Sequence, residues 1–176
     1  MKHFSALILA IVLLAAVPAW TAEPKIAYVD LQTALNESES GKAAKEKIAL
    51  KVKQYEGVIN SSQEELKALK DELEKKALLL SEEARANKER DYQQKVKEFQ
   101  RFTKDAQEEL RQEDADFTRR ILDGLLQTVE EIGAQEGYTL IMEKTESSIL
   151  YADRAIDLTE KLVHSYNAAF RAQKGQ

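Results

Sequence analysis

The middle of the chain repeats a pattern of apolar positions every seven residues. Residues 42–135 contain no proline and are rich in Ala, Glu, Lys, Gln, Leu and Arg, which predicts helix throughout. The first half of this stretch has a seam of Ile48, Val52, Tyr55, Ile59, Ser62, Leu66, Leu69, Leu73, Lys76 and Leu80. The second half has a seam of Tyr92, Val96, Phe99, Thr103, Ala106, Leu110, Glu113 and Phe117. Alternating steps of four and three are typical of a coiled coil.

The two seams are out of phase with each other. Continuing the first seam past Leu80 leads to positions 83, 87 and 90, and it never reaches Tyr92. Ser81 can cap a returning helix, and the two glutamates after it suit a first helical turn. The pattern therefore predicts that the chain turns back between the two seams.

We therefore expect two antiparallel helical arms over residues 42–135, with a tip near residues 81–84. When the seams are matched large to large and polar to polar, Leu69 lies opposite Val96, Ser62 opposite Thr103 and Lys76 opposite Glu89. Any two heptad seams can be aligned in some register, so this match favours one register without excluding others.

Short strands are predicted on either side of the arms. The β-rich segments are 25–30, 138–143 and 149–152, the last two forming a hairpin. Isolated strands of this length are marginal in water, so both ends of the helical region must return to one place. We expect residues 23–41 and 136–176 to form a β-containing oligomerisation body. Its predicted contact residues are Ile26, Tyr28, Val29, Tyr138, Leu140, Ile149 and Tyr151.

Helix caps complete the expected body. Asp30 can cap a brief helix over residues 31–36, and Ser40 can cap the first arm. Asp157 and Glu160 have the spacing of a capping box for a last helix. The predicted fold class is α+β and mostly α, with a long antiparallel helical hairpin projecting from a small β-sheet body that assembles as an oligomer.

The N-terminus reads as a secretory signal peptide over residues 1–22. Lys2 precedes a 14-residue apolar run, too short to span a bilayer, and small residues follow it. The predicted cut lies between residues 19 and 22, so we expect the mature protein outside the cytoplasm. The chain contains no cysteine, so packing or oligomerisation must stabilise it instead of disulfides.

Charge and composition exclude several functions. The arms hold 19 basic and 19 acidic residues between positions 42 and 125, and no basic stripe suggests nucleic-acid binding. The sequence offers no Gly-rich phosphate loop, metal-spaced cluster or catalytic constellation, so we predict no enzyme and no cofactor. We expect His164 to be a solvated surface residue.

Two local features of the arms stand out. Gly57, Asn60, Ser61 and Ser62 form the weakest helical patch of the first arm, and Ser62 is matched with Thr103. This patch is either a tolerated soft spot or a flex point. Val58, Leu78, Leu79 and Phe102 are apolar but lie off the seam, so they are candidates for weak contacts to unfolded chains or ordinary surface residues.

The two ends carry a family resemblance. The segments "KIAYVDLQTALNESESGKAAKEKI" and "YTLIMEKTESSILYADRAIDLTEKLVHSYN", on either side of a long charged helical pair, resemble the Skp (OmpH) family of periplasmic chaperones. The resemblance implies a homotrimer whose arms enclose unfolded outer-membrane proteins in the periplasm without ATP. A client-free coiled-coil spacer or scaffold of the cell envelope is the alternative. The sequence pI of about 5.3 argues against binding lipid or lipopolysaccharide by charge.

Overall fold

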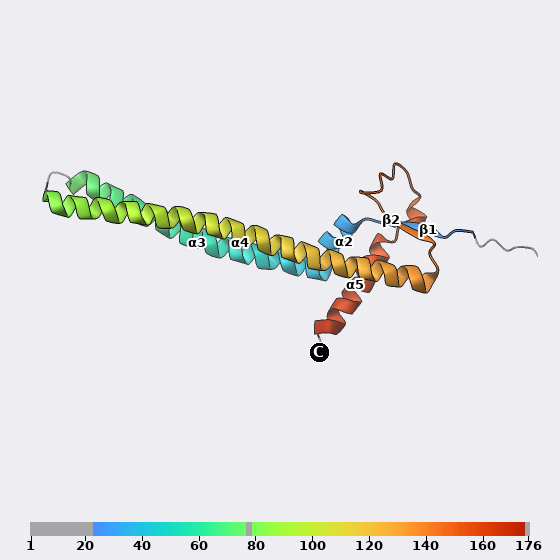
Figure 1. Cartoon of the computed structure of the whole chain (residues 1–176). Coiled ribbons are helices and arrows are strands. Elements are labelled where there is room, and N and C mark those ends of the chain that lie inside the picture. Colours follow the sequence, from blue (N-terminus) through green and yellow to red (C-terminus); the bar gives the residue numbers. More distant parts are fainter. Residues whose placement is uncertain (1–22, 77–78, 175–176) are drawn as a thin grey trace, which may run out of the picture.

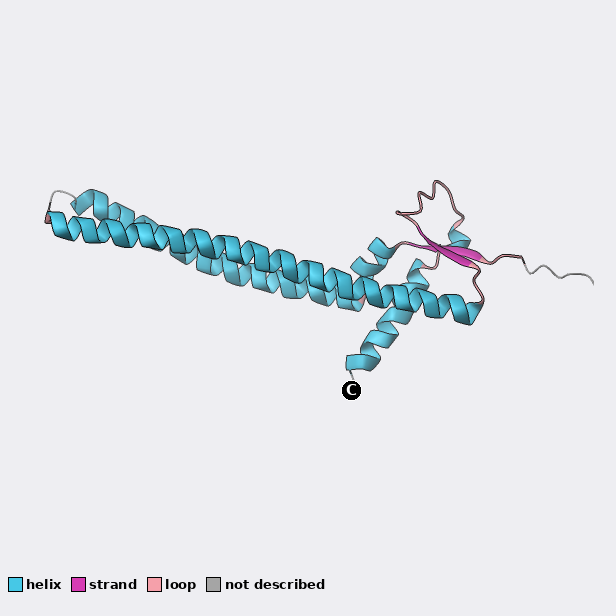
Figure 2. Cartoon of the chain, viewed as in Figure 1, coloured by secondary structure: helices cyan, strands magenta, loops and turns pink. Residues whose placement is uncertain are grey.

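The computed structural model describes residues 23–76 and 79–174. Two long helices run side by side away from a small body, where the two strands lie (Figures 1 and 2). The elements are β1 (Ile26–Val29), α2 (Leu31–Glu37), α3 (Glu39–Lys76), α4 (Glu82–Glu136), β2 (Leu140–Glu143), the 3₁₀ helix η1 (Arg154–Ile156) and α5 (Thr159–Lys174). The α+β class and the helical hairpin are as predicted. The proposed signal peptide lies outside the described residues.

The helical arms are α3 and α4, and their contact face is the predicted seam. From Ile48 to Leu73 each seam residue of α3 is half-buried, while most intervening residues are exposed. The seam of α4 is half-buried from Tyr92 to Phe117, with Ala106 fully buried. Apolar side chains are thus removed from water where the arms touch, which stabilises the hairpin.

The chain turns back slightly earlier than predicted. Helix α3 ends at Lys76 and α4 begins at Glu82, so the connection falls at residues 77–81 and not at 81–84. Ser81 is the N-cap of α4 as predicted, because its hydroxyl oxygen accepts a hydrogen bond from the Ala84 N–H at 3.3 Å. The cap satisfies one of the free N–H groups at the helix start.

The contacts between the arms agree with the predicted register. Glu65 pairs with Lys95 at 2.8 Å, and Glu72 pairs with Lys88 at 3.0 Å. Such flanking pairs are compatible with the predicted register, which places Leu66 opposite Phe99, and these two residues line one groove together.

The predicted pairing of Lys76 with Glu89 is not formed. Lys76 binds Glu72 of its own helix at 2.8 Å, and Glu89 binds Arg85 of its own helix at 2.9 Å. Residues four apart on a helix are neighbours on its surface, so each of these charges has a partner of opposite sign on its own arm.

The body contains a two-stranded parallel sheet. Ile26 pairs with Leu140, and the register continues to Val29 with Glu143. Parallel strands need a long crossover between them, and here the crossover is α2 together with the whole helical hairpin. The prediction that both ends of the helical region return to one place is therefore confirmed.

The predicted third strand at residues 149–152 is wrong, and so is the hairpin with residues 138–143. The segment forms no helix or strand and pairs with no strand among the described residues. One edge of β1 is taken by β2, and the other is bridged at Tyr28 by Asp157. The chain after β2 passes through a turn at 144–148, with Ser148 at φ 51°, and projects from the body as a loop (Figure 1).

Four elements share the core of the body. The buried residues are Ala27, Val29, Ala34, Ile121, Leu125, Ile132, Leu158 and Leu162, from β1, α2, α4 and the start of α5. Helix α4 is therefore both an arm and a wall of the body. Because Gly137 adopts a left-handed φ of 69°, α4 stops there and the chain turns into β2.

Two of the four predicted caps need correction. Asp30 caps α2 as predicted, accepting a hydrogen bond from the Thr33 N–H at 2.8 Å. Ser40 does not cap α3, because α3 already begins at Glu39 and the Ser38 hydroxyl accepts from the Gly41 N–H at 3.0 Å. Asp157 accepts from the Thr159 N–H at 2.8 Å, whereas its own N–H bonds the Arg154 carbonyl, so no capping box with Glu160 forms.

Candidate functional site: the arms and the exposed edge of the body

A groove with a volume of about 220 Å³ lies between the arms, about half-way along their length. Val58, Ser62, Glu65 and Leu66 of α3 and Lys95, Glu98, Phe99 and Phe102 of α4 line it. It brings together two predicted client-contact residues, Val58 and Phe102, and one predicted flex residue, Ser62. Phe102 also meets Tyr55 edge to face, with ring centroids 5.7 Å apart.

Further apolar side chains on the arms face solvent. Val58 is 47% exposed, and Leu79, in the connection between α3 and α4, is 84% exposed. Leu78 lies outside the described residues. The sequence prediction overlooked Leu50, which is 58% exposed on α3. The rule that selected Val58, an apolar residue off the seam, would have found Leu50 too.

The predicted flex patch lies inside an unbroken helix. Helix α3 continues through Gly57, Asn60 and Ser61, and these three residues are exposed. A Cβ added at Gly57 would meet no atom within 4 Å. The Thr103 hydroxyl donates to the Phe99 carbonyl of its own helix at 2.9 Å, so this polar side chain of the seam finds its hydrogen-bond partner within α4.

Ion pairs tie the arms together along the edges of the seam. Near the body, Lys51 lies 2.6 Å from both Glu109 and Glu113, and Lys47 lies 2.9 Å from Glu113. Hydrogen bonds from Lys51 and then Lys47 lower the pKa of Glu113. Lys51 and Tyr55 likewise lower the pKa of Glu109. These carboxylates remain charged at neutral pH.

The same pattern recurs near the tip around Glu72. Hydrogen bonds from Lys76 and then Lys88 lower the pKa of Glu72 to about 2. Because Lys76 belongs to α3 and Lys88 to α4, this carboxylate joins the two helices just before the turn. The arms thus combine a narrow apolar seam with charged edges.

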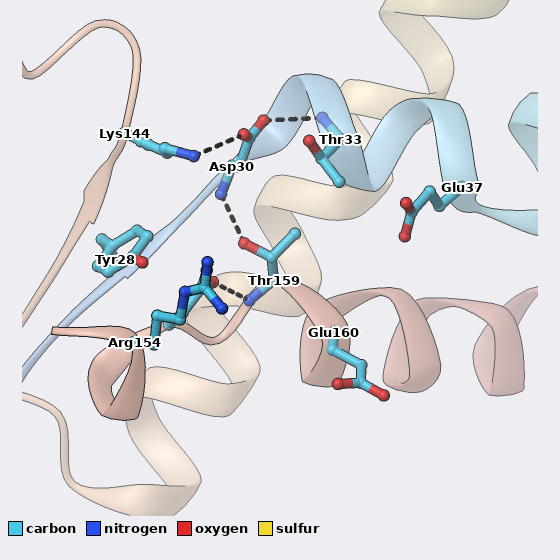
Figure 3. Close-up of a pocket in the computed structure, with 9 residues that line it drawn as sticks. Tyr28, Asp30, Thr33, Glu37, Lys144, Arg154, Thr159 and Glu160 are labelled. Atoms are coloured by element: carbon cyan, nitrogen blue, oxygen red, sulfur yellow. Dashed lines mark hydrogen bonds and ion pairs between the residues drawn. The ribbon is translucent and has the colours of Figure 1, made fainter. Parts of the chain in front are cut away.

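A polar pocket of about 630 Å³ opens where β1 ends (Figure 3). At its centre Asp30 accepts from the Thr33 N–H and lies 3.4 Å from the Lys144 ammonium, and its own N–H donates to the Thr159 hydroxyl at 2.9 Å. The Thr33 N–H, as the largest influence, lowers the pKa of Asp30. Burial raises the pKa of Tyr28, reinforced by a hydrogen bond to Asp157. These contacts fasten β1, α2 and α5 together, so we assign the pocket a structural role.

The body also exposes large apolar side chains. Leu150 is fully exposed and Tyr151 nearly so, while Ile26 and Leu140 are partly exposed on the sheet. The sheet has only two strands in the described part of the chain, which leaves the outer edge of β2 without a strand. These residues make the sheet end of the body the best candidate for an assembly surface.

The other predicted body residues hold the body together from within. Tyr28 and Val29 are buried in the core of the single chain, and Tyr138 and Ile149 are half-buried. The Tyr138 ring packs under the Lys25 ammonium at 3.9 Å and against the core cluster. Sequence reasoning also missed Leu150, although it lies inside the segment predicted to be a strand.

Two classes of site are missing from residues 23–76 and 79–174. No group of three or more His, Cys, Asp or Glu side chains there could hold a metal ion. None of the described helices combines the length and the apolar character needed to cross a bilayer. His164 is exposed, as expected.

The fold therefore defines an arm-bearing protein in which a long helical hairpin projects from a small α+β body. The chain belongs to the OmpH family, described as outer membrane protein (OmpH-like), whose model matches residues 25–166.

Relatives and a solved structure agree with this membership. A Skp-like protein of Pseudomonas aeruginosa (strain PAO1) is 27% identical over 167 residues, covering 95% of this chain and 98% of the relative. An uncharacterized protein of Aquifex aeolicus (strain VF5) is 28% identical over 137 residues, covering 78% of this chain and 82% of the relative.

The fold also matches a crystal structure from Caulobacter crescentus CB15 that is described as an OmpH-like outer membrane chaperone. The TM-score is 0.77 at 18% identity, with 84% of this chain and 86% of the other covered. At this identity the match shows a shared fold.

Proposed function

We propose that this protein is an ATP-independent holdase chaperone of the periplasm. In this role it holds unfolded outer-membrane proteins between its arms and delivers them for membrane assembly. The observation that carries the proposal is the combination of long charged arms with scattered exposed apolar side chains, Leu50, Val58 and Leu79. The family membership and the chaperone description of the Caulobacter structure support it.

The physical logic is that weak contacts must act together. A holdase without ATP has to release its client, so no single site can bind tightly. The groove at Val58 and Phe102 is small for a ligand pocket, which is typically about 300–1,000 Å³. Such grooves suit single apolar side chains of an unfolded chain, and the charged surface around them keeps the arms soluble.

The proposal includes assembly as a homotrimer through the sheet end of the body. Single exposed apolar residues are ordinary, but Leu150, Tyr151, Ile26 and Leu140 all belong to the same small unit. A two-stranded sheet is marginal by itself, so pairing with other copies would stabilise it. Three pairs of arms around one space would enclose a client.

The test is suppression of aggregation. A barrel protein unfolded in urea is diluted into buffer with increasing amounts of this protein, and light scattering is followed. We expect scattering to fall to a plateau at a fixed stoichiometry without ATP. The variant Leu50→Gln/Val58→Gln/Leu79→Gln should weaken protection, whereas Lys53→Gln/Lys67→Gln on exposed positions of the same helix should not. No protection by the wild type would favour a client-free envelope spacer.

A further inference from the structure

Helix α5 lies across the place where both arms join the body. In Figure 1 it diverges from the direction of the arms at the base of α3 and α4, with its C-terminal end pointing away. Its side chains reach the start of α3 and the C-terminal part of α4 at this level. Tyr166 also packs against the core of the body.

The join of α3 to the body is a single residue, which is buried and hydrogen-bonded to Leu35 and Gly41. Helices α2 and α3 are separated only by Ser38, which is extended with φ −62° and ψ 151°. A single extended residue between two helices can act as a joint, because rotation about its two backbone angles changes the angle between the helices.

Helix α5 braces this joint with three side chains. Asn167 Oδ1 accepts a hydrogen bond from the Glu39 N–H at 2.9 Å, satisfying a free donor of the first turn of α3. The Ser40 hydroxyl donates to the Tyr166 hydroxyl at 3.1 Å. Arg171 lies 3.3 Å from the Glu39 carboxylate.

Helix α4 has a weak point at the same level. Gly124 lies inside α4, where glycine costs about 1 kcal/mol of helix stability relative to alanine. A Cβ at this position would lie 2.7 Å from Cε2 of Tyr166, so the Tyr166 ring rests directly on the backbone of α4. Tyr166 also stacks with Phe170, with centroids 6.4 Å apart.

We propose that Tyr166 and Asn167 are positioning residues that fix the direction in which the arms leave the body. The two residues contact the join at Ser38, through its neighbours Glu39 and Ser40, and the backbone at Gly124, through the Tyr166 ring. Their contacts are named the α5 clasp here. Without them the seam still holds α3 to α4, so the hairpin stays folded but its root can bend.

A small change at the root is amplified at the tip. Helix α3 has 38 residues, which at 1.5 Å per residue makes it about 57 Å long. A rotation of about 10° at the root therefore moves the tip by about 10 Å on this geometry. The clasp would control the width of the space between arms of an assembled protein. That consequence rests on the proposed function, but the clasp itself does not.

The direct test measures distances by pulsed electron paramagnetic resonance. The chain contains no cysteine, so Gln32→Cys in α2 and Lys67→Cys in α3, both exposed, can carry spin labels without background. Labelled chains are mixed with excess unlabelled chains so that only distances within one chain are recorded. Tyr166→Phe/Asn167→Ala removes the hydrogen bonds of the clasp, and Gly124→Ala displaces the ring.

We expect both variants to broaden the distance distribution about twofold, given the length of the lever. Gly124→Ala is informative because it strengthens α4 as a helix, and a stiffer helix alone would narrow the distribution. His164→Ala, exposed on the same helix, is the control and should leave the width unchanged.

Unchanged widths in both variants would overturn the proposal. Loss of helical content by circular dichroism would overturn it too, since the contacts would then hold the fold and not the direction of the arms. The measurement needs no client, so its failure is separate from failure of the proposed holdase function.

Discussion

Glu65 of α3 and Lys95 of α4 lie 2.8 Å apart and form an ion pair across the arms. Seven residues further along α3, Glu72 meets Lys88, which lies seven residues back along α4. The two pairs repeat one antiparallel heptad register near the tip. This register is the simplest feature of the structure to test by exchange of charges.

Charge reversal should identify the register. Glu65→Lys places two lysines against each other and should lower the urea midpoint of unfolding slightly, because exposed pairs contribute little. Adding Lys95→Glu should recover most of this loss. The measurement is urea unfolding followed by circular dichroism. The control is Glu64→Lys with and without Lys95→Glu, because Glu64 is exposed and outside the pair. Recovery by both double variants would contradict the register.

Protonation of Glu72 at low pH should weaken the contact between the two arms near the tip. Its pKa is lowered from an ordinary 4.5 to about 2 by Lys76 and Lys88. A lowered carboxylate pKa contributes stability that is present above the ordinary pKa and is lost as pH falls toward the folded value. We expect the thermal midpoint of wild type to fall toward that of Glu72→Gln between about pH 4.5 and pH 2. A constant difference between the two proteins across that window would contradict the assignment.

The weak helical patch of α3, which contains Gly57 and Ser62, should determine how large a client the arms can hold. Open space surrounds Gly57, so Gly57→Ala should raise helix stability by about 1 kcal/mol. Ser62 lines the groove between the arms, so Ser62→Leu adds an apolar layer there. The double variant should protect small barrel proteins as well as wild type and large ones less well, measured by light scattering. Equal protection of both sizes would mean that the patch is a tolerated imperfection. Gln54→Ala, at an exposed position of α3 outside the patch, is the matched control.

Removing the exposed apolar residues of the body should separate the subunits. Leu150→Ser/Tyr151→Ser should convert an assembled wild type into a folded monomer at micromolar concentration, because the lost apolar area lies outside the core of the single chain. Light scattering coupled to size-exclusion chromatography gives the mass. Thr145→Ser in the turn after β2 is the control. A wild type that is itself a folded monomer would contradict assembly.

The heptad pattern was sufficient to identify the two arms and the side chains between them. Every seam residue from Ile48 to Leu73, and from Tyr92 to Phe117, is at least half-buried, because period alone determines which face of a helix is apolar. Ser81 was recognisable as a cap, since capping depends on residues within one turn. The predicted strand at residues 25–30 is too short to be stable alone, so the sequence also implied that it must pair with another strand.

Tertiary structure decided what the local pattern leaves open. Two heptad seams can be aligned in more than one register, and contacts such as those of Leu66 and Phe99 around one groove decide which register forms. The segment 149–152 has strand composition, but both edges of β1 are occupied by β2 and Asp157, so it stays unpaired. The contact of Tyr166 with Gly124 joins residues distant in sequence, through a close approach that no periodicity encodes. Periodicity determines which face is buried, whereas contacts between distant segments determine what that face meets.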